Sequence, residues 1–187
     1  MKKLLIFLLT FILLNVSDSN AKLMKKEEIK SYIYNLDLFS AHIRICYASP
    51  VLCKVSANLY DDFYPYINRM YYSVVKHESI NFRYRQGLKD RYDYGLPQVN
   101  IRFWTKSKLH TLGYELKTLE QLRYDDKLAL DVGFTIFWYN IVYGFYHGTR
   151  YRAIVDYVGS YHSPASNKGK NVKCYIRKVK ANFYKVR

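Results

Sequence analysis

The sequence predicts a single, mainly α-helical domain that follows a cleaved signal peptide. Apolar residues recur at helical spacing through much of the chain, and no segment shows the sustained alternation of apolar and polar residues that is typical of strands. No repeats and no low-complexity linkers divide the chain. About 166 residues remain after the signal peptide, which is enough for one domain with a hydrophobic core.

The N-terminus has the three parts of a secretory signal peptide. Lys2 and Lys3 supply a positive charge, residues 4–14 are an unbroken apolar run, and a polar stretch leads to Ala21. The run has 11 residues, whereas a helix that spans a bilayer needs about 20. We therefore expect residues 1–21 to be removed after Ala21, rather than to remain as an anchor, and the mature chain to be periplasmic or otherwise exported. No later stretch is expected to cross a membrane.

Helical signals follow one another along the mature chain. A first helix is predicted over residues 26–47. Ser49 and Pro50 then have the N-cap and N1 chemistry that opens a second helix, through about Tyr60. Pro65 opens a third, which ends near residue 79.

The second half of the chain alternates loops and helices. Residues 80–97 contain Gly87, Gly95 and Pro97, and we predict a loop or a loop with a short ribbon there. Helical signals return over 98–110, 115–122 and 126–146. A polar loop then leads to a basic helix over about 171–185. Together these elements predict an N-terminal helical segment over 22–60 and a main domain over 61–187.

The composition is strongly basic and rich in tyrosine. The chain carries a net charge of +15 and contains 21 Tyr residues, and removal of Lys2, Lys3 and Asp18 with the signal peptide leaves +14. Such a charge attracts polyanions. An exported protein rarely meets nucleic acid, and the sequence shows no nucleic-acid-binding motif, so an anionic surface of the cell envelope is the expected partner. The alternative is that Lys and Tyr are frequent because the gene is rich in A and T.

Three cysteines, Cys46, Cys53 and Cys174, lie in a chain that we expect to be exported, where disulfides form. Cys46 and Cys53 enclose a short loop and could pair with each other. A bridge from Cys174 to either is equally compatible with the spacing. No pair of cysteines and histidines has the spacing of a metal site, and none is predicted.

Glu78 is the candidate for acid/base chemistry. It lies four residues after Val74 and seven after Tyr71, so it shares the apolar face of the third predicted helix. Burial disfavours the charged form of a carboxyl and raises its pKa. A general acid needs such a raised pKa to hold a proton near neutrality. Taken alone, however, the segment favours an ordinary solvated glutamate at a helix end.

A further observation favours the catalytic interpretation of Glu78: four characteristic segments occur in a fixed order along the chain. They are YYSVVKHESINF (71–82), DYGLPQVNIRFW (93–104), DDKLALDVG (125–133) and DYVGSYHSP (156–164). Together they resemble the lytic transglycosylases of the soluble type, and the resemblance covers roughly residues 60–185. It implies a lysozyme-like (α+β) fold and, among small exported members, an association with a secretion or conjugation apparatus.

The resemblance also implies roles for individual residues. Glu78 takes the position of the catalytic acid/base, and Tyr161 that of the tyrosine whose hydroxyl contacts the catalytic carboxyl. The expected substrate-binding residues are Ser79, Gly95, Leu96, Gln98 and Asn100. Some positions depart from the family pattern: Pro97 replaces the usual methionine, Asp126 and Ala129 stand where proline and asparagine are commoner, and His162 and Ser163 replace an Asn-Ala pair. We expect His162 and His77 to be structural.

The activity that the resemblance implies is cleavage of the bond between N-acetylmuramic acid and N-acetylglucosamine in peptidoglycan glycan strands. Glu78 alone would transfer both protons and leave a 1,6-anhydro sugar, without a cofactor. The alternatives are a hydrolase of the same fold, for which Asp90 or Asp93 could activate water, and a catalytically silent protein that binds or assembles the cell wall.

Overall fold

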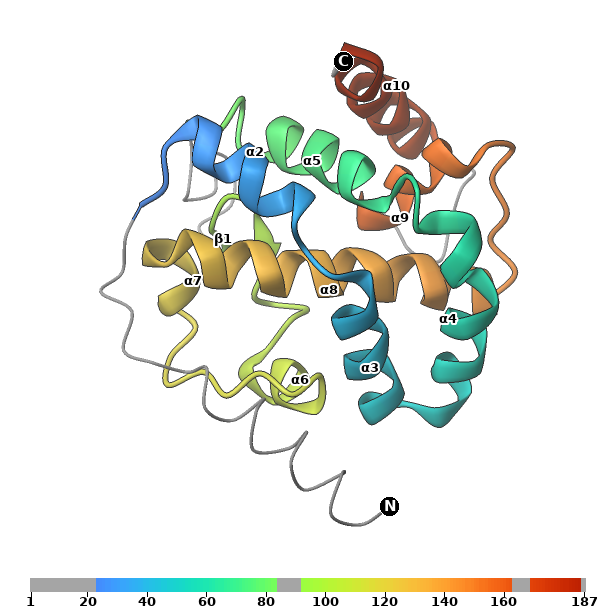
Figure 1. Ribbon diagram of the computed structural model, residues 1–187, viewed down its shortest axis with the longest axis horizontal. Coiled ribbons are helices and arrows are strands. Elements are labelled where there is room, and N and C mark those ends of the chain that lie inside the picture. The colour runs from blue at the N-terminus through green and yellow to red at the C-terminus, as the bar shows by residue number, and fades with distance from the viewer. Residues whose placement is uncertain (1–22, 84–91, 163–168, 186–187) are drawn as a thin grey trace.

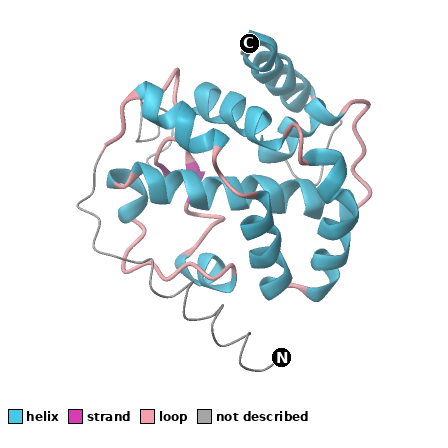
Figure 2. Cartoon of the chain, in the orientation of Figure 1, coloured by secondary structure: helices cyan, strands magenta, loops and turns pink. Residues whose placement is uncertain are grey.

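The computed structural model describes residues 23–83, 92–162 and 169–185, and this part of the chain is mainly helical (Figures 1 and 2). The predicted signal peptide lies outside the described residues. Shorter helices surround one long helix, α8 (Asp126–Tyr146), which runs across the middle of the molecule. The mainly α class is thus confirmed.

The first four helices of the described residues are α2 (Lys26–Tyr34), α3 (Leu38–Ala48), α4 (Pro50–Phe63) and α5 (Ile67–Glu78). The single helix expected over 26–47 is in fact two, because Asp37 starts a new one: its carboxylate accepts hydrogen bonds from the backbone N–H groups of Phe39 and Ser40. Ser49 caps α4 and Pro50 occupies its first turn, as predicted.

A short antiparallel ribbon connects the two halves of the molecule. Strand β1 (Asp93–Tyr94) pairs with β2 (Val99–Asn100), and Asp93 lies opposite Asn100. The helix expected over 98–110 is therefore wrong in its first part, since Gln98 has a φ of 56° and reverses the chain. Helical structure resumes only at α6 (Lys106–Thr111), and α7 (Gln121–Tyr124) is a single turn.

The C-terminal part packs against α5 and α8. After α8 come a 3₁₀ helix, η1 (Ile154–Val158), and the short α9 (Gly159–His162), neither of which the sequence pattern predicted. The last helix, α10 (Lys170–Lys185), follows the predicted range closely and contacts α5, η1 and α9. It forms one edge of the molecule in Figure 1.

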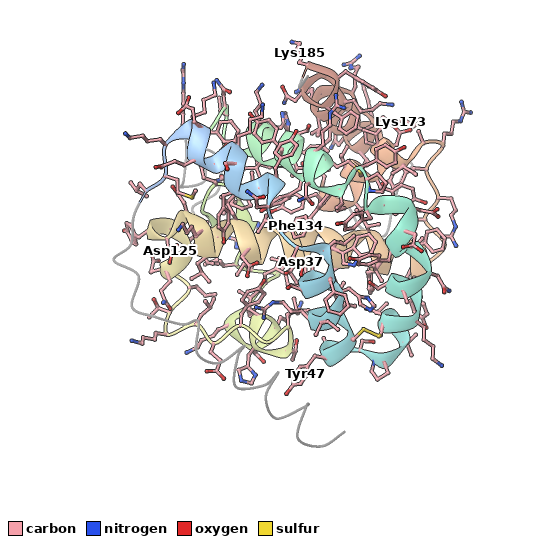
Figure 3. The ribbon with its side chains drawn as sticks, in the orientation of Figure 1. Asp37, Tyr47, Asp125, Phe134, Lys173 and Lys185 are labelled. Atoms are coloured by element: carbon pink, nitrogen blue, oxygen red, sulfur yellow. A yellow bond between two sulfur atoms is a disulfide. The ribbon has the colours of Figure 1, made fainter. Side chains whose placement is uncertain are left out.

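Helix α8 is apolar on every side. Phe134, Phe137 and Trp138 are fully buried, and Figure 3 shows Phe134 at the centre of the molecule. The expectation that no later stretch could cross a membrane was wrong as to length and composition, because α8 meets both criteria. However, 72% of its most apolar window is buried inside the protein, so its apolar surface is covered by other helices.

The first helices share their core with the rest of the chain. The predicted division between residues 60 and 61 lies within α4, and one cluster of buried side chains unites α2, α3, α4, α5 and α8. Within it, the indole N–H of Trp138 donates a 2.8 Å hydrogen bond to the hydroxyl of Ser56, which also contacts Nδ1 of His42 at 2.8 Å.

One disulfide joins neighbouring helices. Cys46 on α3 is bonded to Cys53 on α4, and Cys174 is free (Figure 3). Of the pairings that the sequence allowed, this is the local one, which closes the α3–α4 turn.

Gly133 brings α5, α8 and the ribbon close together. A methyl group added to Gly133 would lie 2.4 Å from the hydroxyl oxygen of Tyr71 and 2.6 Å from two ring carbons of Pro97. Tyr71 in turn donates a 2.8 Å hydrogen bond to the carbonyl of Leu130. The absence of a side chain at Gly133 therefore allows the turn before β2 to pack directly on α8.

Gly133→Ala should destabilise the protein despite the better helix propensity of alanine. That propensity gains about 1 kcal/mol, whereas overpacking a tight core costs about 1–3 kcal/mol. We expect a net loss in the free energy of unfolding, measured by chemical denaturation. Gly169→Ala is the matched control, because its added methyl meets only Val172, at 3.8 Å. Equal stability of the Gly133 variant and the wild type would contradict the close packing.

Candidate active site

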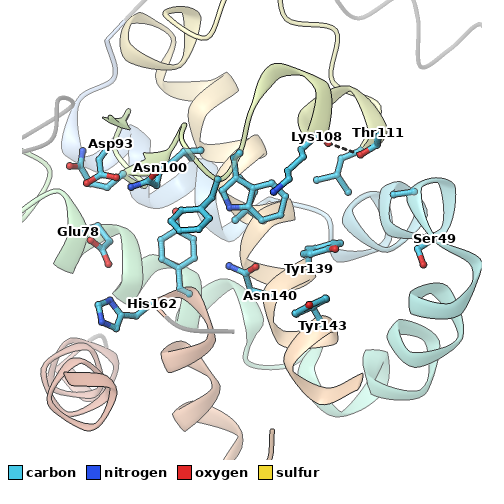
Figure 4. A pocket seen from close by; sticks show the side chains of 18 residues that line it. Ser49, Glu78, Asp93, Asn100, Lys108, Thr111, Tyr139, Asn140, Tyr143 and His162 are labelled. Atoms are coloured by element: carbon cyan, nitrogen blue, oxygen red, sulfur yellow. Dashed lines mark hydrogen bonds between the residues drawn. The ribbon is translucent and has the colours of Figure 1, made fainter. Parts of the chain in front are cut away.

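A cleft of about 850 Å³ runs between the ribbon, α5, α6, α8 and α9. Figure 4 shows Glu78, Asp93, Asn100 and His162 towards one end, and Lys108, Thr111, Tyr139 and Tyr143 towards the other. The polar side chains that line it are Ser49, Glu78, Asp93, Gln98, Asn100, Lys108, Thr111, Asn140 and His162. The aromatic ones are Phe103, Trp104, Tyr139, Tyr143 and Tyr161.

Glu78 is the last residue of α5 and faces this cleft. The preceding turns of α5 are buried, including Tyr71, Val74 and Val75, and Glu78 itself is half-buried. The pKa of Glu78 is raised from 4.5 to about 7, mainly because burial disfavours the charged carboxylate; the Tyr175 hydroxyl acts in the opposite direction, and the charge of Asp93 contributes to the rise. The carboxyl therefore holds a proton close to neutral pH.

The chain makes a strained turn directly after Glu78. Ile80, Asn81 and Phe82 all have positive φ angles, of 45°, 59° and 66°, a conformation that side-chain-bearing residues rarely adopt. Ser79 holds the turn, since its hydroxyl donates to the carbonyl of Val75 at 2.6 Å and accepts from the N–H of Phe82 at 2.9 Å. Strained segments of this kind are often found at functional sites.

Ser79 therefore has a different place from the one expected. It is fully buried and does not line the cleft, so the expected contact with substrate is replaced by a structural role. Ser79 is the C-cap of α5 and holds the turn that follows Glu78.

Burial and, after it, the charge of the nearby Glu78 carboxyl raise the pKa of Tyr161, but the expected contact of its hydroxyl with that carboxyl is not the one the structure shows. Tyr161 lines the cleft, but its hydroxyl donates a 2.6 Å hydrogen bond to the carbonyl of Pro97. It ties α9 to the ribbon. The tyrosine hydroxyl that lowers the pKa of Glu78 belongs to Tyr175 on α10, which the sequence analysis did not single out.

Tyr175 is held between two histidines. The His162 ring stacks on it with centroids 5.0 Å apart, and the His77 ring meets it edge to face at 5.2 Å. Its buried hydroxyl makes no hydrogen bond of ordinary geometry to any described residue, yet it lies near enough to Glu78 to lower the pKa of that carboxyl. His77 has the structural place that we expected, whereas His162 lines the cleft.

Gly95 and Leu96 lie in the turn between the two strands of the ribbon and do not line the cleft. A methyl group added to Gly95 would lie 2.4 Å from the carbonyl oxygen of Leu122 and 2.7 Å from Cβ of Ala129, and its φ is 71°. Leu96 is fully buried in the core. The expected direct contacts of these two residues with substrate are thus corrected to packing contacts that fix the ribbon on α7 and α8.

Gln98 and Asn100 do line the cleft, as expected of residues that bind sugar. The side-chain amide of Gln98 donates a 2.7 Å hydrogen bond to the carbonyl of Gly95, which orients it. The side-chain oxygen of Asn100 accepts from the N–H of Arg102 at 3.1 Å, which turns its amino group away from that contact. Each amide keeps hydrogen-bonding capacity for a ligand.

The structure adds residues that sequence reasoning missed. Asn140 and Tyr139 on α8, Trp104 after the ribbon and Lys108 on α6 all line the cleft. Asn140 is buried, yet Figure 4 shows its amide directed into the middle of the cleft. Residues of α8 could be placed here only once the orientation of the helix was known, because its apolar pattern has no polar face.

Among the described residues, one cluster has the chemistry of a metal site. His42, Cys46 and Cys53 offer ligand atoms within 4.8 Å of one another, but both cysteine sulfurs are joined in the disulfide. A disulfide sulfur is not a thiolate ligand, so we assign this cluster no metal.

Comparison with protein-family models gave no match, and comparisons with curated proteins and with solved structures gave none either.

Glu78→Gln should stabilise the protein at neutral and alkaline pH. The folded carboxyl has a pKa of about 7, above its ordinary 4.5, so the folded state binds the proton more tightly than the unfolded state does. The stability of the wild type therefore falls as pH rises from about 4.5 to about 7, by up to a few kcal/mol. Glutamine does not titrate, so the Glu78→Gln variant does not lose stability over this pH range. The stability difference between the two proteins, measured by denaturation from about pH 4 to about pH 8, should grow with pH; a pH-independent difference would contradict the raised pKa.

Proposed function

We propose that this protein is a peptidoglycan lytic transglycosylase whose catalytic acid/base is Glu78. The observation that carries the proposal is a carboxyl with a raised pKa at a helix end, facing a cleft of about 850 Å³. The resemblance of four segments to that family supports the same assignment. The lysozyme-like fold that it implies belongs to this proposal.

Chemically, the reaction needs a group that first gives and then takes a proton. Protonated Glu78 donates to the oxygen between N-acetylmuramic acid and N-acetylglucosamine as that bond breaks, and the N-acetyl group of the substrate stabilises the positive centre. Ionised Glu78 then takes the proton of the muramic C6 hydroxyl, whose oxygen bonds to C1. A pKa of about 7 suits both steps, since catalysis is most effective when the pKa lies near the working pH.

The other cleft residues fit a sugar ligand. Gln98, Asn100 and Asn140 present amides, which can both donate to and accept from hydroxyl and N-acetyl groups. The aromatic side chains supply flat apolar surfaces that can cover the faces of sugar rings. Neither feature calls for a cofactor.

A hydrolase of the same fold is the second candidate, and Asp93 favours it. Asp93 lines the cleft with Glu78 and is close enough for its charge to raise the pKa of Glu78. Most glycosidases use two carboxyl groups, and Asp93 could activate a water molecule. Asp90, the other acid considered, lies outside the described residues.

The proposal places the protein in the cell envelope. The predicted signal peptide, the net charge of +15 and the disulfide between Cys46 and Cys53 are together consistent with export. A secretion or conjugation apparatus that needs a local opening in the wall is the proposed partner, on the resemblance alone.

Mass spectrometry of the products released from purified sacculi tests the activity. We expect 1,6-anhydro muropeptides from the wild type, and a loss of about 10³-fold or more with Glu78→Gln, because the amide cannot transfer a proton. Reducing ends without anhydro sugar would favour the hydrolase, and no release of products would favour a silent binding protein.

Asp93→Asn separates the two enzymatic candidates. In a transglycosylase Asp93 only tunes Glu78, so its neutralisation should lower the pKa of Glu78 and change the rate modestly. In a hydrolase it would remove the base and lower kcat by about 10²–10⁴-fold. The measurement is kcat on soluble glycan strands across the pH range.

Tyr175→Phe should move the alkaline limb of the kcat/KM profile to higher pH. The Tyr175 hydroxyl favours the charged form of Glu78, so its removal should raise the pKa of Glu78 further and keep the acid protonated to higher pH. Tyr161→Phe is the matched control, since its hydroxyl is bonded to Pro97: this change should leave the limb in place. A shift in the Tyr161 variant but not in the Tyr175 variant would reverse these roles.

A further inference from the structure

The charges in the cleft are unevenly distributed. Glu78 and Asp93 lie at the end formed by α5 and the ribbon, and Lys108 on α6 lies towards the other end (Figure 4). Lys108 is the one lysine or arginine side chain among the described residues that line the cleft. A ligand that spans the cleft therefore meets carboxyl groups near one end and a cation near the other.

The backbone at Lys108 is anchored while its side chain is exposed. Its N–H donates to the hydroxyl of Thr105 at 3.4 Å, and its carbonyl accepts a 2.7 Å hydrogen bond from the hydroxyl of Thr111. Within the described part of the chain, the structure shows no ion pair for Lys108. By contrast, the ammonium of Lys106 donates to the carbonyl of Lys117 at 3.0 Å, and that of Lys180 pairs with Asp156 at 2.6 Å.

An aromatic wall stands beside Lys108. Trp104 meets Tyr139 edge to face with ring centroids 5.3 Å apart, and Tyr139 stacks on Tyr143 at 5.9 Å. All three rings are half-buried and line the cleft, so each leaves part of its surface to a ligand. Figure 4 shows Lys108 reaching from α6 towards the side of the cleft where Tyr139 and Asn140 lie.

An apolar wall with one cation at its edge fits a ring that carries a carboxylate. The aromatic faces cover the ring, Asn140 can bond its polar substituents, and the ammonium pairs with the negative group. We propose that Lys108 and this wall form a carboxylate-binding subsite that selects muramic acid residues, through the lactyl group or the first carboxylates of the peptide stem. This inference rests on the proposed function, because it takes the glycan strand as the ligand.

The test is binding, which does not require catalysis. Glu78→Gln protein with and without Lys108→Gln is titrated by calorimetry with three glycans: strands with peptide stems, the same strands after an amidase has removed the stems, and N-acetylglucosamine oligomers. The first carries the carboxylates of its stems, since its lactyl groups are in amide linkage to them; the second carries the lactyl carboxylates that the amidase has freed, and the third carries none. Lys106→Gln is the matched control, with the same loss of charge on the same helix but outside the cleft lining.

Lys108→Gln should weaken binding of the carboxylate-bearing glycans by about three- to tenfold, as expected for a partly exposed charge pair, and leave binding of the oligomers unchanged. Loss with the stem-free strands alone identifies the lactyl carboxylate, loss with the stem-bearing strands alone identifies the stem carboxylates, and loss with both shows that the subsite accepts either. Equal weakening for all three ligands, or for none, would overturn the subsite.

If none of the glycans binds to the Glu78→Gln protein, the proposed function fails together with the subsite. If products form from sacculi while Lys108→Gln has no effect on binding, only the subsite fails.

Discussion

The structure depends on the burial of α8, a helix of 21 residues that has no polar face. A helix that is apolar all round must be covered on all sides, and here α3, α4, α7 and α9 contact it directly. Two of the polar groups that α8 carries inside are paired with other helices or loops: the indole N–H of Trp138 is bonded to Ser56, and Thr135 to the hydroxyl of Tyr114. This need for cover brings segments far apart in the sequence to one place, and the cleft lies along the side of α8 where Tyr139, Asn140 and Tyr143 are exposed to it.

The candidate acid is positioned by contacts that lead back to the same helix. Gly133 lets Pro97 approach α8, and the carbonyl of Pro97 accepts a hydrogen bond from the hydroxyl of Tyr161, so the ribbon and α9 are joined beside the cleft that Glu78 faces. Ser79 ends α5 and holds the strained turn that follows. Because burial and the nearby charge of Asp93 both raise the pKa of Glu78, the carboxyl keeps a proton near neutrality.

Features that depend on residues close together in the sequence could be predicted, whereas features that depend on contacts between distant residues could not. Ser49 and Pro50, the apolar run of α8 and the basic α10 carry local signals, and those helices were predicted closely. Glu78 was singled out by the resemblance of four segments, because helical spacing alone favoured an ordinary solvated glutamate. The ribbon was expected only as an alternative, since its shape depends on the positive φ of Gly95 and Gln98 and on packing against α7. Tyr175 was missed because it lies 97 positions after Glu78, and only the packing of α10 on α5 brings the two together.

The most direct test of this account is a site-specific titration of the Glu78 carboxyl. Carbon NMR of protein labelled at the glutamate carboxyl carbons follows each group with pH, and Glu78→Gln assigns the resonance. The account predicts a titration midpoint of about 7 for Glu78, and a lower one in Asp93→Asn. A midpoint near the ordinary 4.5 would contradict it, because a carboxyl that ionises there would hold almost no proton at neutral pH to give to a glycosidic oxygen.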